Sequence, residues 1–322
     1  MTVTSLTHRG WPVLRLISDQ LQVDLVPGQG GTILQLRRRL DDLAVLGQTP
    51  WGLRPYGAVP PPASATAQAM ETWAGGWRTL FPNAGRSSVA NGVELGETGE
   101  ACLAGYDWIE VDDGIQLTTR LSRVPFVLNR TVTLVDDAVT VTESVRNVGG
   151  EDVTVMWGQQ LMFTAPVIGP STTVDSGATI VRPDTDVVSS ASWDDLMPWP
   201  RAHGVDGLIN LRTLPAPDAD ETRRCYLTDF TESRLSVRNV DLDLEVNLTW
   251  NSNAWPYAWY DLEAGRDSGF PWYKAGYFLA LGPASSWPAR GVHEAERLSE
   301  LLLFHPDDEK TATLTVAVRP AS

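Results

Sequence analysis

Short runs rich in Val, Ile and Thr recur along the chain, and turn residues such as those in "PGQGG", "VDD" and "NVGGED" separate them. Many runs alternate apolar with polar residues, which is the period of a half-buried strand. They lie at 13–18, 21–27, 32–38, 114–121, 126–135, 138–147, 152–158, 224–230, 234–239, 242–250, 275–282 and 311–320. The only helix signal is a short one within 292–304. Strand runs without intervening helices predict an all-β protein with antiparallel sheets packed face to face.

Two long stretches, 51–105 and 182–220, lack the strand pattern. Loops of this length in a compact domain are usually functional or disordered. The tryptophans of these stretches and the segment "GGWRTLFPNAG" argue against disorder. Neither an internal repeat nor a linker divides the chain, so we expect one domain over residues 1–322.

The charge of the chain constrains its partners. Its 322 residues include 40 acidic and 25 basic ones, a formal net charge of −15. Nucleic acids and anionic membranes attract cationic surfaces, so we expect neither as a partner. The N-terminal "MTVTSLTHRGWPVLRL" lacks the apolar core of a signal peptide, and no apolar run is long enough to span a bilayer. We expect a cytoplasmic protein that binds a small molecule, with Cys102 and Cys225 as reduced thiols; the sequence does not fix the oligomeric state.

The segment 71–88 is the first candidate site. Trp73 and Trp77 offer flat faces, and Asn83 and Arg86 offer directional donors, a combination that suits a polyhydroxylated ligand. The alternative is a rigid, well-packed loop. The four histidines show no metal-ligand spacing, and the chain has no phosphate loop or dinucleotide fingerprint, so we expect neither a metal nor a cofactor.

A second unusual segment is "VMWGQQLMFTAP" at 155–166. The pattern predicts a strand, yet Gln159 and Gln160 interrupt its apolar run. A buried amide costs free energy unless its donors and acceptor find partners.

The order of motifs resembles the galactose mutarotase-like superfamily, whose members include the aldose 1-epimerases. "LQVDLVPGQGGTILQL" resembles the family's opening hairpin, and "GGWRTLFPNAG" with "GVELGETGEA" resembles its sugar-binding segment. "VMWGQQLMF" is similar to the W-G-H-H-P-x-F strand. "WYKAGYFLALGPASSWP" and "LLFHPDDEKTATLTVAV" are similar to the two C-terminal strands. The resemblance covers nearly the whole chain and implies a β-supersandwich that holds a sugar against a concave sheet.

The resemblance also implies that the usual proton-transfer groups are replaced. The family's strand histidine falls on Gln160, and often a second one falls on Gln159. The histidine of its H-G-E motif falls on Thr98, and its C-terminal glutamate falls on Gly282. Because mutarotation needs an acid and a base that titrate near neutral pH, these replacements predict weak or absent mutarotation of free hexoses.

Three functions stay open. The first is a carbohydrate-active enzyme that uses other groups for epimerisation, elimination or hydrolysis: Glu100 and Asp261 as carboxylates, with Tyr260 or Tyr273 as a hydroxyl partner. The second is a sugar-binding sensor or partner subunit without catalysis. The third is an aldose 1-epimerase whose acid and base lie elsewhere, with Glu263 or Glu100 in place of the missing glutamate. In each, we expect the sugar to contact the following residues: Trp77, Asn83, Arg86, Gln159, Gln160 and Trp259.

Overall fold

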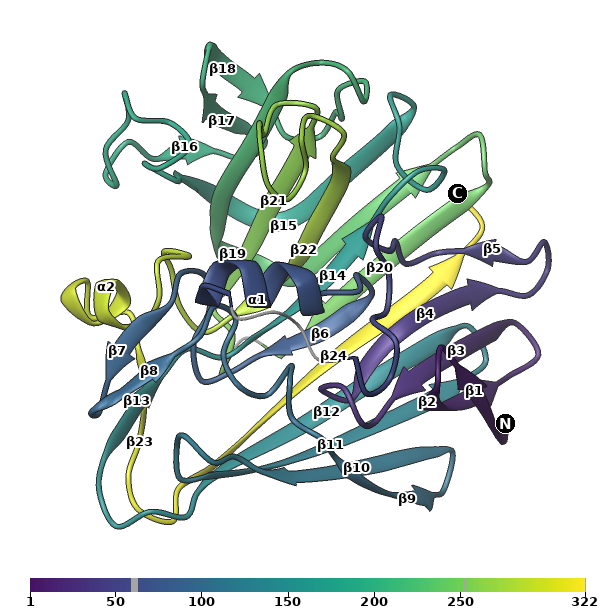
Figure 1. Cartoon of the computed structure of the whole chain (residues 1–322). Coiled ribbons are helices and arrows are strands. Elements are labelled where there is room, and N and C mark those ends of the chain that lie inside the picture. Colours follow the sequence, from purple (N-terminus) through teal and green to yellow (C-terminus); the bar gives the residue numbers. More distant parts are fainter. Residues whose placement is uncertain (59–62, 252, 322) are drawn as a thin grey trace.

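Antiparallel strands make up most of the molecule (Figure 1). The computed structural model describes residues 1–58, 63–251 and 253–321. Strands account for 53% of the chain and helices for 4%. The expected all-β, antiparallel architecture is confirmed, and the two main layers belong to one continuous 18-stranded sheet.

The first layer carries the candidate site. Its strands pair one after another and end on the long strand β19. In spatial order they are β1 (Thr2–His8), β2 (Trp11–Ile17), β3 (Leu21–Val26), β4 (Thr32–Arg38), β6 (Trp77–Leu80), β14 (Gly158–Phe163), β22 (Tyr277–Ala284), β21 (Tyr257–Ala264) and β19 (Glu221–Asn239).

The second layer returns to the far half of β19. Its strands are β9 (Asp107–Val111), β10 (Gly114–Arg120), β11 (Phe126–Val135), β12 (Ala138–Asn147), β24 (Glu309–Arg319) and β20 (Leu244–Trp250). Strand β15 (Thr172–Pro183) pairs with β19 along most of its length. Because β19 pairs with β21 at one end and β20 at the other, it joins the two layers.

Short elements complete the fold. Three two-stranded pairs lie at its edges: β7 (Ser88–Ala90) with β8 (Val93–Leu95), β13 (Val153–Val155) with β23 (Leu302–Phe304), and β17 (Arg201–Gly204) with β18 (Gly207–Asn210). Strand β5 (Leu43–Ala44) pairs with β4, and strand β16 (Met197–Pro198) pairs with β15. In the described part of the chain the helices are α1 (Ala65–Thr72) and α2 (Val292–Arg297).

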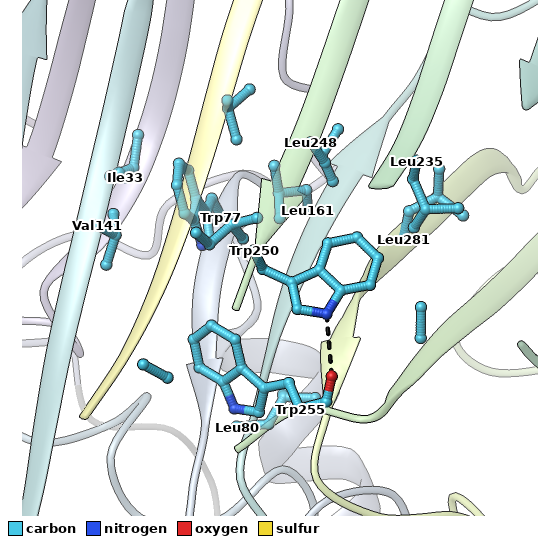
Figure 2. Packing of buried hydrophobic residues seen from close by; sticks show 14 of the residues in the cluster. Ile33, Trp77, Leu80, Val141, Leu161, Leu235, Leu248, Trp250, Trp255 and Leu281 are labelled. Atoms are coloured by element: carbon cyan, nitrogen blue, oxygen red, sulfur yellow. Dashed lines mark hydrogen bonds between the residues drawn. The ribbon is translucent and has the colours of Figure 1, made fainter. Parts of the chain in front are cut away.

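The main core lies between the two layers. Leu161, Leu281 and Tyr260 from the first layer and Val141 and Leu314 from the second are fully buried. Figure 2 shows Trp77, Trp250 and Trp255 packed with the aliphatic side chains of this core, where the Trp250 indole donates a hydrogen bond to the Trp255 carbonyl oxygen at 2.9 Å. Since side chains alternate along a strand, the neighbouring residues of β14, β21 and β22 face outward from the core.

Several elements differ from the sequence prediction. The runs at 224–230 and 234–239 are one continuous strand, β19, and the run at 152–158 is divided between β13 and β14. Strands β15 and β21 were not predicted, and neither was α1, which Ser64 caps by accepting a hydrogen bond from the Ala67 amide. The short helix expected within 292–304 is confirmed as α2.

Candidate functional site

A cavity of about 260 Å³ lies on the outward face of the first layer, where β19, β21, β22, β14 and β6 run side by side. Alternate residues of these strands line it, and helix α1 adds Met70. The lining residues from the strands include Thr222, Arg224, Trp259, Asp261, Glu263, Phe278, Ala280, Gly282, Gln160, Arg78 and Leu80.

Gln159 borders the cavity, but its amide belongs to a buried network between the layers. Its Oε1 accepts a hydrogen bond from the Trp77 indole at 2.8 Å, and its Nε2 donates to Glu143 Oε2 at 2.7 Å. Glu143, on β12, also accepts from Trp157 at 3.0 Å and pairs with buried Arg130, whose Nη1 lies 3.7 Å from Glu143 Oε1. The first of the two glutamines is therefore a structural link, which satisfies its polar atoms inside the core.

Gln160 points to the opposite face and meets Arg78 directly across the β14–β6 pairing. Its Oε1 accepts hydrogen bonds from Arg78 Nε at 2.8 Å and Nη2 at 2.6 Å. The Gln160 amide nitrogen has no hydrogen-bond partner among the described residues, so it can donate to a ligand in the cavity. The second glutamine is therefore fixed by an arginine on the cavity face of the sheet.

Asp261 lies at the other side of the cavity, on β21. Arg224 is its register partner on β19, and the Arg224 Nη2 donates to Asp261 Oδ2 at 3.1 Å. The charge of Asp261 is the main cause that raises the pKa of Arg224 above its usual value.

Glu263 follows two residues later on the same face of β21 and is 1% exposed. Its Oε1 accepts hydrogen bonds from the backbone amides of Arg266 at 2.6 Å and Asp267 at 2.7 Å. Its Oε2 is buried and has no hydrogen-bond partner within the described ranges. Gly276 leaves room for this side chain, because a Cβ at position 276 would lie 2.8 Å from the Glu263 Cγ.

Burial raises the pKa of two carboxyl groups in the cavity. Desolvation raises the pKa of Glu263 above its usual range. Desolvation and then the charge of Asp261 raise the pKa of Asp267, which also lines the cavity. Asp261 and Glu263 on β21, together with Asp267 three residues after the end of this strand, are called the β21 carboxylates below. One of them is ion-paired to an arginine and the pKa values of the other two are raised, an arrangement that suits one proton acceptor and one proton donor.

Aromatic rings flank the polar groups. Trp259 fixes its ring by a 2.8 Å hydrogen bond from its indole to the Ser286 carbonyl oxygen. On the other side, Trp272 packs against Phe278 with ring centroids 4.8 Å apart and against Trp73 at 6.2 Å. These four rings all border the cavity.

The structure brings together several residues predicted from the sequence. Arg86, Gln159, Gln160, Trp259 and Asp261 all border the cavity. Thr98 and Gly282, where the family places a histidine and a glutamate, also border it. The Thr98 hydroxyl donates to the Glu97 carbonyl oxygen at 2.6 Å, and Gly282 offers only backbone.

Other predicted residues lie elsewhere. The expectation that Asn83 and Glu100 line the cavity is wrong. Asn83 is fully buried, donates to the carbonyl oxygens of Arg86 and Gly96, and accepts from the Val292 amide. Glu100 accepts hydrogen bonds from the Ser122 and Arg123 amides at 2.8 and 3.0 Å, which hold it in a loop contact outside the cavity.

Three aromatic predictions need the same correction. Trp77 is fully buried in the core, where it binds Gln159. Tyr260 alternates with Asp261 along β21, so its ring faces the core and its hydroxyl donates to the Leu211 carbonyl oxygen at 3.2 Å. Tyr273 is 70% exposed and does not line the cavity.

Arg78, Arg224 and Asp267 were not singled out from the sequence. A signal for Arg78 was present: in "GGWRTL" it follows Trp77, so a strand that buries Trp77 must turn Arg78 to the other face. Arg224 and Asp267 lacked such a signal, because their place depends on the pairing of β19 with β21.

The described residues contain no cluster of three or more His, Cys, Asp or Glu side chains arranged to hold a metal ion. Within the same ranges, neither helix has the length and apolar composition needed to cross a bilayer.

Comparison with known proteins identifies the fold. No protein-family model matches the sequence, and no curated protein matches it. Similar solved structures include a galactose mutarotase-related enzyme from Lactobacillus acidophilus (15% identity, 96% of this chain and 98% of that one, TM-score 0.68). A galactose mutarotase-like protein from Lactobacillus casei (15%, 95% and 100%, 0.66) and a candidate aldose 1-epimerase from Klebsiella pneumoniae (13%, 97% and 80%, 0.75) are also similar. The chain therefore has a galactose mutarotase-like fold, as the resemblance predicted.

Proposed function

We propose that the cavity binds a sugar or glycoside and that the β21 carboxylates perform acid/base chemistry on it. The observation that supports this most directly is the unlike environments of Asp261 and Glu263, two residues apart on one face of one strand. Asp261 is ion-paired to Arg224, whereas Glu263 is buried with one unpartnered oxygen and a raised pKa. Such pairs divide into a base and an acid.

Anomer interconversion is the simplest reaction for this pair. Asp261 removes the proton from the anomeric hydroxyl while Glu263 donates a proton to the ring oxygen, and the bond between that oxygen and the anomeric carbon breaks. The open-chain aldehyde then rotates about the adjacent carbon–carbon bond. The ring oxygen attacks the other face, returns its proton to Glu263, and Asp261 returns its proton to the anomeric oxygen.

The position of β21 allows Asp261 to act in place of the glutamate that the resembled family carries at position 282. Gly282 on β22 stands where the family glutamate would stand, and its register partner is Trp259 on β21. Adjacent strands are about 4.8 Å apart and two residues along a strand span about 6.6 Å. Asp261 therefore starts about 8 Å from position 282, and its side chain covers part of that distance toward a sugar lying over β22.

The aromatic and amide groups support sugar binding in the same cavity. Trp259 presents a fixed ring on the β21 side, and Trp272 and Phe278 form an apolar wall. Gln160 keeps its amide nitrogen available for a hydroxyl. An apolar lining with a few convergent polar groups is typical of small-molecule sites.

The test is anomer exchange measured by NMR on a panel of monosaccharides, with Asp261→Asn, Glu263→Gln and Asp267→Asn variants. Loss of an acid or base usually costs 10²–10⁴ in rate, so we expect about that loss in the first two. Glu100→Gln is the matched control, because Glu100 holds a loop outside the cavity. Full activity in both Asp261→Asn and Glu263→Gln contradicts the assignment, and loss in Asp267→Asn in place of Glu263→Gln moves the acid to Asp267.

A second candidate, sugar binding without turnover, has its own supporting observation. Gln160 and Gly282 supply no titratable group at the two positions where relatives of the resembled family carry their acid and base. Saturable binding of a sugar without exchange of any anomer in the panel would favour this candidate. Isothermal titration of wild type and the Asp261→Asn variant measures whether each protein binds the sugar. Anomer exchange measured by NMR on the same two proteins then separates the two functions, because a pure binder has no exchange rate that the substitution could lower.

A further inference from the structure

Arg78 occupies an unusual place in the cavity. It is 5% exposed, lines the cavity and packs against Trp73. Its guanidinium carbon lies 4.4 Å from the centroid of the Trp73 ring, a cation–π contact. Its Nε and Nη2 donate to Gln160 Oε1, a neutral acceptor. The group is therefore rigidly held, as a ligand-binding side chain should be.

Among the described residues, no carboxylate forms an ion pair with Arg78. The ion pairs found within the described residues do not include it, whereas the other two cavity arginines are paired: Arg86 with Asp186 at 2.8 Å and Arg224 with Asp261 at 3.1 Å. Glu97 also lines the cavity and attracts Arg78 electrostatically, without an ion pair. Burial lowers the pKa of Arg78 to about 10, so the side chain is a cation at neutral pH.

A buried cation without a counterion is costly, and proteins normally pair such charges. The Nη1 group of Arg78 donates to no acceptor within the described ranges. It remains available to an anion that enters the cavity. The protein as a whole carries a net charge of −15, which favours neutral ligands, so a positive site inside the cavity is a local feature.

The charges of the cavity are separated along the sheet. In the strand order β21, β22, β14, β6, Asp261 and Glu263 lie on the first strand and Arg78 lies on the last. At about 4.8 Å per strand their backbones are about 14 Å apart, and their side chains converge on the space between. A pyranose whose anomeric carbon lies near β21 would direct its far substituent toward Arg78.

We infer that the ligand of this cavity is an acidic sugar, whose carboxylate, phosphate or sulfonate group is bound by Arg78. This inference rests on the proposed function, since it assigns the substrate class of the same site. A charge-assisted hydrogen bond contributes more than a neutral one. We expect the acidic group to improve affinity by about tenfold to a hundredfold over the matching neutral sugar.

The experiment is isothermal titration of the wild-type protein with glucose, glucuronate and glucose 6-phosphate at neutral pH. The two acidic probes distinguish a carboxylate from a phosphate as the preferred group. The variants are Arg78→Gln, which keeps a hydrogen-bond donor without charge, Arg78→Lys, which restores the charge, and Arg319→Gln. The last is a control at an arginine paired with Asp137 on the far layer. Circular dichroism verifies that each variant is folded.

The expected result is a preference for one or both acidic sugars in wild type and Arg319→Gln, its loss in Arg78→Gln, and its partial return in Arg78→Lys. Affinity for glucose equal to or above that for both acidic probes in wild type overturns the inference, even if no variant folds. A preference that survives in Arg78→Gln overturns the role of Arg78. Absence of binding by all three sugars instead contradicts the proposed function from which the inference starts.

Discussion

The backbone of Gly282 lies directly against the carbonyl group of Gln159 on the neighbouring strand. A Cβ added at position 282 would stand 1.8 Å from the Gln159 oxygen and 2.7 Å from its carbonyl carbon. Real Cβ atoms do not approach backbone so closely. The contact means that β22 and β14 can adopt their present separation only with glycine at this position. The close packing of β22 against β14 therefore excludes a glutamate side chain at position 282. Restoring that side chain would require the two strands to move apart, and not only the substitution of one residue.

The first prediction follows from this contact. Gly282→Ala should destabilise the fold, because the β14–β22 pairing must open to admit a methyl group. Overpacking of this kind costs about 1–3 kcal/mol, and the backbone contact places the expected value at the upper end. Urea denaturation measures the change in the free energy of unfolding. Gly105→Ala is the control, since a Cβ there meets nothing within 4 Å and the backbone is not in the left-handed region. Equal stability of both variants would show that the two strands separate readily.

The second prediction concerns the buried network between the layers. Glu143 is 1% exposed and Arg130 is fully buried, and Glu143 accepts hydrogen bonds from both Gln159 and Trp157. Removing one member of a buried ion pair leaves the other charge uncompensated, which costs about 3–5 kcal/mol. We expect a loss of that size for Glu143→Gln in chemical denaturation. Glu110→Gln, on the exposed strand β9, should change stability by less than about 0.5 kcal/mol. A small effect at Glu143 would mean that the network contributes little net stability.

The layout of the site could be predicted only in part from the sequence. The fold followed from runs such as 126–135 and 138–147, where local alternation and turns agree with the final pairing. Strand β21 was not predicted as a strand because its "YAWYDLEA" carries two acidic residues, which are rare in strands. Those two residues line the cavity, so local propensity failed where the strand carries polar groups into it.

The roles of the two glutamines show a second limit. Their amide groups indicated that both side chains needed hydrogen-bond partners. The opposite directions of Gln159 and Gln160, however, follow from which face of β14 meets the second layer. Asn83 was placed in the cavity as a directional donor beside two tryptophans, and Glu100 because it occurs in a motif that resembles a sugar-binding segment. In the structure their side chains satisfy backbone groups of nearby loops, and contacts of that kind depend on tertiary geometry.

The third prediction uses the raised pKa of Glu263. A carboxyl group whose pKa is higher in the folded state than in the unfolded state stabilises the fold below the unfolded pKa. That contribution disappears as the pH rises through the folded pKa, because the buried group must then ionise. Glu263→Gln removes this dependence. We expect the free energy of unfolding of Glu263→Gln to increase relative to that of wild type as the pH rises from about 4 to 8, so that the variant becomes relatively more stable.

Thermal unfolding of both proteins across this range measures the difference. Glu245→Gln on β20 serves as a control carboxylate far from the cavity. A difference between wild type and Glu263→Gln that does not vary with pH would show that Glu263 titrates alike in the folded and unfolded chains. The acid role assigned to Glu263 would then lose its electrostatic support.

The last prediction concerns free hexoses. We expect the wild-type protein to interconvert the anomers of glucose and galactose poorly, because Thr98, Gln160 and Gly282 supply no proton-transfer group and because Arg78 favours an acidic ligand.

Gln160→His alone should not restore mutarotation. The new imidazole would lie beside the Arg78 cation, which disfavours the imidazolium that could donate a proton, and position 282 has no room for the missing carboxylate. Polarimetry of freshly dissolved α-glucose, at a pH where the spontaneous reaction is slow, measures both proteins. Turnover by wild type on the order of 10² per second, well within the enzyme range, would mean that the acid and base act efficiently on neutral sugars. A gain of that size in Gln160→His would instead show that the β21 carboxylates already supply a base within reach of the ring, and that only the acid was missing.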